Sequence, residues 1–294
     1  MMNCNVERAE ELRLAGMAAM RTNDPEQAVR SFDEALRLVG RDDDLRELIV
    51  INKAGALIEL ERSGPEVQQL TQIIMRRRSA KHTFLAAYNV QNKYAIEGDY
   101  KRASFYAQLA LTTAEAASEL EWRLGALLAL GILSGLESKF TDEIAYYERI
   151  LELSPEGSED LRLCLTLQNL GYSHLMIGST EKGLELIHQA VEMMARVGAQ
   201  GFAPESYLDL CLGYLELGRF DRATHYGELG MECATEVRQV RNAHYLLGEA
   251  AFKAGDTESA SFHFEKLAKF YPDFPNLKNL LFAIDLRGFV NFKL

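Results

Sequence analysis

Apolar residues recur with the spacing of an α-helix along most of this chain, in stretches of helical length that short polar turns separate. One turn appears most clearly at residues 98–103 (GDYKRA), 218–223 (GRFDRA) and 255–260 (GDTESA). Glycine commonly follows the last turn of a helix, and a polar residue commonly caps the first turn of the next helix. Each copy therefore predicts a helix that ends at glycine and a second helix that starts directly after it.

Seven copies of this arrangement follow one another along the chain. Aligned at one position of the second helix, they fall at Ala28, Val67, Ala103, Glu143, Gly183, Ala223 and Ala260. Neighbouring copies are 36 to 40 residues apart. A fixed repeat of about 20–50 residues predicts a solenoid, in which each repeat packs on the next. We predict antiparallel helix pairs near residues 6–40, 45–78, 82–117, 122–155, 160–196, 203–236 and 240–272.

The residues inside the repeats resemble those of the tetratricopeptide repeat family. The fourth and seventh copies show this best, through Leu130, Gly131, Phe140, Tyr147, Ile150 and Pro155, and through Leu247, Gly248, Gly255, Ala260, Phe264 and Pro272. The resemblance implies an all-α, right-handed α-solenoid in which small residues let two helices approach and large ones, such as Tyr147 and Phe264, are buried. The period near 40 exceeds the family's usual length of about 34 residues, so a HEAT-like array is the alternative fold.

Residues 275–294 break the phase of the repeat. Their apolar residues are Leu277, Leu280, Leu281, Phe282, Ile284, Leu286, Phe289, Val290 and Phe292. The last repeat of a solenoid leaves an apolar face open and needs a cap. We therefore predict a repeat array over residues 1–274 and a C-terminal capping helix over residues 275–294. Because that helix is apolar on more than one face, two states remain open, a monomer and a homodimer through this helix.

Charge and hydropathy argue against two kinds of partner. The formal net charge of −11 disfavours a nucleic-acid surface, which needs a basic face. The longest apolar run, residues 124–133, is far shorter than the ~18–20 residues that span a bilayer. The N-terminus has no apolar stretch of the signal-peptide type, so we predict a cytoplasmic protein with no membrane partner. The basic residues Arg76, Arg77, Arg78 and Lys81 fit a solvated helix end or a docking site for an acidic partner.

We find no catalytic motif in the sequence. Phosphate-binding, nucleophile-elbow and zinc-protease patterns are all absent. The six histidines are scattered over four of the seven repeats, without carboxylates at ligand spacing, and the four cysteines are not at CxxC spacing. We therefore predict that the protein is not an enzyme and holds no metal or cofactor.

Candidate binding residues follow from the resemblance, which implies that the first helix of each pair lines the concave surface. The candidates in the third, fifth and seventh repeats are Tyr88, Asn89, Asn92, Gln168, Asn169, Tyr172, Tyr245 and Glu249. Amide side chains can bond the backbone of an extended peptide, and tyrosines add rigid contact area with a polar tip. The alternative is that these residues face water or pack on neighbouring helices. Asn89 and Asn92 stand out, because asparagine is mildly unfavourable inside a helix.

These observations predict a scaffold or adaptor that binds a peptide or protein segment in its concave groove. The alternative is a regulatory, peptide-sensing module whose array changes curvature when the peptide binds. The sequence does not identify the partner.

Overall fold

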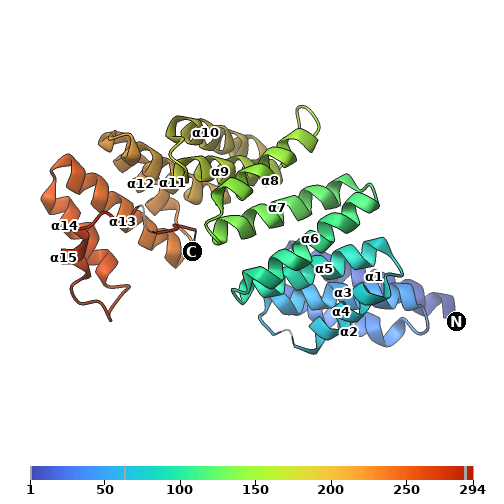
Figure 1. The fold of residues 1–294 in the computed structure, drawn as a ribbon. Helices are drawn as coiled ribbons and strands as arrows, with labels where there is room; N and C mark the ends of the chain where they lie inside the picture. The colour runs from blue at the N-terminus through green and yellow to red at the C-terminus, as the bar shows by residue number, and fades with distance from the viewer. Residues whose placement is uncertain (1, 63, 288–289, 294) are drawn as a thin grey trace. The chain divides into compact units, whose positions relative to one another are not determined.

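A computed structural model of the protein describes residues 2–62, 64–287 and 290–293. All regular elements in these ranges are helices (Figure 1). They are α1 (Met2–Arg21), α2 (Pro25–Leu38), α3 (Asp43–Glu59), α4 (Pro65–Arg76), α5 (Ala80–Ile96), α6 (Tyr100–Ala116), α7 (Leu120–Leu136), α8 (Phe140–Leu153), α9 (Leu161–Met176), α10 (Thr180–Val197), the short 3-10 helix η1 (Gln200–Phe202), α11 (Ala203–Glu216), α12 (Phe220–Cys233), α13 (Val237–Ala254), α14 (Thr257–Ala268) and α15 (Leu277–Leu281). The prediction of an all-α array of helix pairs is confirmed.

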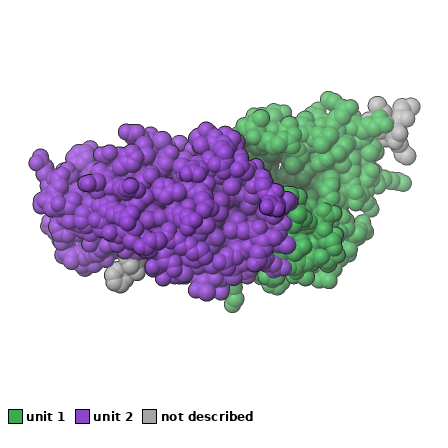
Figure 2. All heavy atoms as spheres, turned by 90° about the horizontal axis from the view of Figure 1, so that it is seen from above, with its two compact units in different colours: residues 1–133 green, residues 134–294 purple. Residues whose placement is uncertain are grey.

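The chain divides into two compact units, residues 1–133 and residues 134–294 (Figure 2). The division falls within α7, close to its last turn. In the first unit an apolar core joins α1, α2 and α3 through residues such as Phe32 and Ile49. In the second unit a larger core extends from α9 to α15 and includes Ile187, Leu210 and Phe264. Each unit thus has its own buried centre, and each is described by itself below.

The glycine turns predicted from the repeats are present. Gly98, Gly218 and Gly255 have φ values of +73°, +67° and +86°, the left-handed conformation that glycine adopts without a steric penalty. At the first of these turns Asp99 caps α6, because its carboxylate accepts a hydrogen bond from the backbone N–H of Arg102 at 3.0 Å. Each turn therefore ends one helix and starts its antiparallel neighbour within a few residues.

Small residues allow the two helices of a pair to approach closely. A Cβ atom added at Gly248 would lie 2.4 Å from the ring of Phe264, and one at Gly16 would lie 2.5 Å from the ring of Phe32. Both rings are fully buried, as is Tyr147, so the predicted burial of Phe264 and Tyr147 is confirmed. In these pairs the ring of the second helix fills the space left by glycine on the first helix.

The chain end differs from the predicted capping helix over residues 275–294. Only α15, a helix of five residues, forms there, and the described residues that follow it are irregular. The reason is that side chains bind backbone N–H groups that a helix would use for its own hydrogen bonds. The N–H of Leu286 donates to the hydroxyl of Tyr245 at 2.9 Å, and the N–H of Arg287 donates to Asp285 at 3.1 Å. Phe289, one of the apolar residues behind the prediction, lies outside the described residues.

Candidate functional site

The first unit contains a groove that we call the first-unit groove. It has a volume of about 570 Å³ and is lined by α1, α3, α5 and α7, the first helices of four successive pairs. Tyr88, Asn89 and Asn92 all line it, so the structure brings together the three candidate residues of the third repeat. Apolar side chains, among them Met17 and Ile132, line the rest of the groove. A mixed apolar and amide lining of this size suits a small ligand or a short peptide.

Asn89 is already engaged within the groove. Its Nδ2 donates a hydrogen bond to the backbone carbonyl of Ile51 on α3 at 2.8 Å. A Cβ atom at Gly55 would lie 3.4 Å from the same nitrogen, so this glycine makes room for the amide. Asn89 therefore holds α5 against α3, and its amide nitrogen is not available in the same way as that of Asn92.

Two further amides in the groove lie buried without a hydrogen-bond partner among the described residues. They are the Nδ2 atom of Asn52 on α3 and the Oε1 atom of Gln91 on α5, and the Gln91 side chain is only 4% exposed. A buried polar group without a partner costs about 1–3 kcal/mol. One of these atoms is a donor and the other is an acceptor, which matches the two hydrogen-bonding groups of a peptide unit.

Gln91 was not among the residues predicted from the sequence, although the repeat contains a signal for it. In register it takes the position that Gly16, Gly55 and Gly131 occupy in other repeats, since Gly55 and Gln91 are 36 residues apart, the shortest repeat spacing. A long amide in place of glycine is therefore a local exception to the close approach of paired helices. Because this position faces a neighbouring helix, where packing favours a small residue, we expect the Gln91 side chain to have a role besides packing.

The remaining candidates lie in the second unit, on α9 and α13. The chain's own C-terminal tail, of which the structure describes residues 285–287 and 290–293, covers Tyr172 and Tyr245 there. The Tyr172 hydroxyl accepts the N–H of Phe292 and donates to Asn291, both at 3.1 Å. The ring of Tyr245 stacks on the ring of Phe292, with the centroids 5.6 Å apart. A segment of this chain therefore lies where a partner peptide was predicted.

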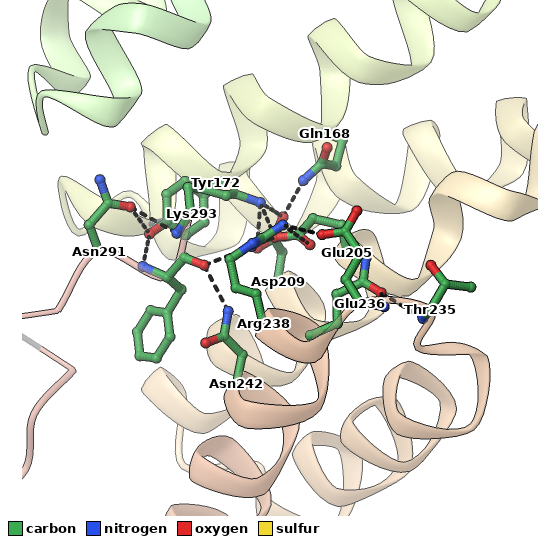
Figure 3. A network of polar contacts seen from close by, with 12 residues as sticks. Gln168, Tyr172, Glu205, Asp209, Thr235, Glu236, Arg238, Asn242, Asn291 and Lys293 are labelled. Carbon is green, nitrogen blue, oxygen red and sulfur yellow. Dashed lines mark hydrogen bonds and ion pairs between the residues drawn. The ribbon is translucent and has the colours of Figure 1, made fainter. Parts of the chain in front are cut away.

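A cluster of four charged side chains holds the tail to α11 and α13 (Figure 3). The Nζ of Lys293 lies 2.8 Å from Asp209 and 3.1 Å from Glu205. Arg238 forms a bidentate pair with Glu205 at 2.9 and 3.0 Å. Burial alone would raise the pKa of Glu205, but Lys293 and Arg238 outweigh it and lower this pKa to about 2. Two cations and two anions thus compensate one another in a buried place.

Three other candidates of the second unit have different roles. Gln168 donates through Nε2 to Asp209 and so orients one carboxylate of the charged cluster. Asn169 is half-buried beside the hydroxyl of Tyr147. Glu249 is buried on α13, and one of its carboxylate oxygens has no hydrogen-bond partner among the described residues.

Glu249 gives a pH dependence that can be measured. Burial, followed by the nearby charge of Asp285, raises its pKa from 4.5 to about 7, and Lys253 and Arg287 oppose this. The folded protein therefore keeps this proton at pH values where the unfolded chain has lost it. The stability that this group contributes is complete below pH 4.5 and is lost as the pH rises through 7.

We therefore expect Glu249→Gln, which cannot ionise, to be more stable than the unchanged protein at pH 8.5 by about 1–3 kcal/mol. At pH 4 the difference should be close to zero, because Glu249 is then largely protonated in both the folded protein and the unfolded chain. Urea unfolding at both pH values measures this, with the exposed Glu228→Gln as the control. Equal pH profiles for Glu249→Gln and the unchanged protein would contradict the raised pKa.

The basic residues near the end of α4 are partly neutralised. Arg76 and Arg78 lie 3.4 and 4.0 Å from Glu47, and Arg78 also lies 3.7 Å from Asp43. These contacts favour a solvated helix end over a docking site for an acidic partner.

Two searches of the described part of the chain gave no candidate. No cluster of three or more His, Cys, Asp or Glu side chains in the described ranges could hold a metal ion. No helix among the described residues is both long enough and apolar enough to cross a membrane.

The class that the fold defines is the helical repeat array, in which antiparallel helix pairs stack on one another. Residues 242–273 match the model of the tetratricopeptide repeat family. This match covers the seventh predicted repeat, and together with the shared fold it confirms the resemblance to the tetratricopeptide repeat family noted in the sequence. A comparison with curated protein sequences found no match.

Several solved structures share the fold at low sequence identity. A tetratricopeptide repeat protein from Parabacteroides merdae is 16% identical with a TM-score of 0.59, over 94% of this chain and 98% of that one. A signal transduction ATPase from Pyrococcus horikoshii with a tetratricopeptide repeat sensor is 14% identical with a TM-score of 0.73, over 94% of this chain and 44% of that one. NprR, in complex with its cognate peptide NprX, is 12% identical with a TM-score of 0.68, over 93% of this chain and 81% of that one.

Proposed function

We propose that this protein is a non-enzymatic scaffold or adaptor, and that its first-unit groove binds an extended peptide or protein segment. The observation that carries this proposal is the pair of buried, unpartnered amide atoms of Asn52 and Gln91 in a groove whose lining is mainly apolar but includes Glu59. A peptide unit would supply the carbonyl and the N–H that these two atoms lack. Asn92 and Tyr88, which line the same groove, add polar contacts for a neighbouring residue of the segment.

The apolar lining supports a segment with hydrophobic side chains. Met17 and Met20 reach the groove from α1, and methionine adapts its shape to different ligands. The structure of NprR was solved with a peptide bound, which shows that an array of this fold can serve this purpose. The groove lies within one compact unit, residues 1–133.

The alternative is a regulatory module that senses a peptide and changes curvature when the peptide binds. The likeness to a tetratricopeptide repeat sensor from Pyrococcus horikoshii favours this alternative. Small-angle scattering with and without a bound peptide separates the two, because a passive scaffold keeps its radius of gyration.

Gln91→Leu tests the proposed groove. Leucine removes an unpartnered buried acceptor at similar volume, so we expect the free energy of unfolding to rise by about 1 kcal/mol. The same change should weaken binding of a groove peptide at least tenfold, because the N–H of the peptide then lacks its partner. The peptide is selected from a displayed library of nine-residue peptides, and its affinity is measured by calorimetry.

Gln108→Leu, at an exposed position of α6, is the matched control and should leave the affinity unchanged. If Gln91→Leu binds the selected peptide as tightly as the unchanged protein does, the amide pair is structural and the proposed groove is wrong.

A further inference from the structure

The C-terminal tail is bound to the second unit in the manner of a peptide ligand. We propose that the surface formed by α9, α11 and α13 is a second binding site, separate from the first-unit groove, for a segment in which an aromatic residue is followed directly by lysine. The tail occupies this site within the same chain. A partner protein that presents a segment of the same chemistry takes the place of the tail.

Side chains of the surface recognise the backbone of the tail at Phe292. The N–H of this residue donates to the hydroxyl of Tyr172 at 3.1 Å. Its carbonyl accepts from Arg238 at 2.9 Å and from Asn242 at 2.7 Å (Figure 3). Both backbone groups of one residue are thus satisfied by side chains from α9 and α13. None of these three contacts involves α15.

The two side chains that define the preference are Phe292 and Lys293. The ring of Phe292 is buried and stacks on Tyr245. Lys293 contacts Asp209 and Glu205, and its Nζ lies 4.4 Å from the centroid of the Tyr172 ring. Without a cation the two carboxylates would be buried close to one another, which is strongly unfavourable. The site therefore selects a lysine next to an aromatic residue.

A cap that only covers an apolar end would not need a buried lysine or paired backbone groups. The tail also leaves space unfilled. An apolar pocket of about 290 Å³ lies beside Phe292, lined by Leu286 and Val290 of the tail and by residues of α13 to α15 that include Leu267 and Leu281. A partner segment with a larger apolar side chain at the position of Val290 would fill this pocket.

That extra contact matters because the tail competes from within the chain. A tethered segment acts at an effective concentration of about 1 mM, so a partner at about 1 µM must bind about a thousandfold more tightly than the untethered tail would. An apolar side chain that fills the pocket beside Phe292 would give a partner segment this gain in affinity. The pocket therefore distinguishes a partner segment from the tail.

The test uses the full chain with its tail weakened by Phe292→Ala and Lys293→Ala, changes that alter no residue of α9, α11 or α13, and circular dichroism establishes that the variant is folded. The probe is a fluorescent synthetic peptide with the sequence of residues 285–293. Fluorescence polarisation should give a dissociation constant at least tenfold lower for the variant chain than for the unchanged chain. A peptide with tryptophan in place of Val290 should bind more tightly still, and a peptide with alanine in place of Lys293 should lose at least tenfold.

Lys278→Ala, which removes a cation on α15 away from the tail, is the matched control and should behave as the unchanged chain. Equal affinity of the probe for the folded variant and the unchanged chain overturns the proposal. Hydrogen exchange on the unchanged chain gives an independent test. The N–H of Phe292 should exchange faster than the N–H of Leu246 inside α13, and equal protection of the two would identify the tail as a permanent part of the fold.

Discussion

Lys293→Met is expected to lower the free energy of unfolding of the second unit by about 3 kcal/mol at pH 8. The change leaves Asp209 and Glu205 buried with only Arg238 as a cation, and a buried ion pair that loses one partner costs about 3–5 kcal/mol. The lower end of this range applies, because the tail can leave the surface and let water reach the carboxylates. Urea unfolding followed by circular dichroism measures the loss.

Two further measurements connect this loss to the buried charges. Burial raises the pKa of Asp209 against the opposing effect of Lys293. With Lys293 removed, this carboxyl takes up a proton more easily, so the loss should be smaller at pH 5 than at pH 8. Adding Asp209→Asn to Lys293→Met should restore part of the stability, because it removes the anion that loses its cation, while Glu205 keeps Arg238. A loss below about 1 kcal/mol at pH 8 would mean that the cluster does not contribute to folding.

Phe264→Ala is expected to destabilise the second unit by about 3–5 kcal/mol, the usual range for a buried phenylalanine. The ring is fully buried, lies against Gly248, and meets the ring of Phe282 edge-on at 5.1 Å between centroids. The backbone at Gly248 offers no side chain that could move into the cavity. Thermal and urea unfolding both report the loss.

Phe262→Ala is the matched control, two residues away on the same helix. Its ring is 54% exposed, so the change should cost no more than about 1 kcal/mol. Equal losses for Phe262→Ala and Phe264→Ala would mean that α14 does not present the face described here to the core.

The helix pairs could be predicted from the sequence because they depend on residues close together in the chain. The glycine at position 98 and the cap at Asp99 act within one turn, and the contact of Gly248 with Phe264 spans a single pair. The same local signal placed Tyr88, Asn89 and Asn92 on a helix that lines a groove. Whether these residues bind a peptide remains a prediction.

The path of the tail could not be predicted in this way. Its apolar residues fit a helix as well as they fit an extended strand buried on two sides. What decides between them is a set of partners far away in the sequence, since Tyr172 and Phe292 are 120 residues apart. A repeat alignment predicts contacts only between neighbouring helices. It contains no information about a segment that packs on a helix pair much earlier in the chain.

The long separation between the tail and its partners has a consequence for synthesis of the protein. The ribosome completes α9, α11 and α13 before residues 290–293 are made, and domains generally fold as their residues emerge. Until then Glu205 and Asp209 face water or whatever cation is near. The second unit therefore acquires its charged cluster as a late step of folding, and during that interval a nascent chain presents an acidic surface that the finished protein covers.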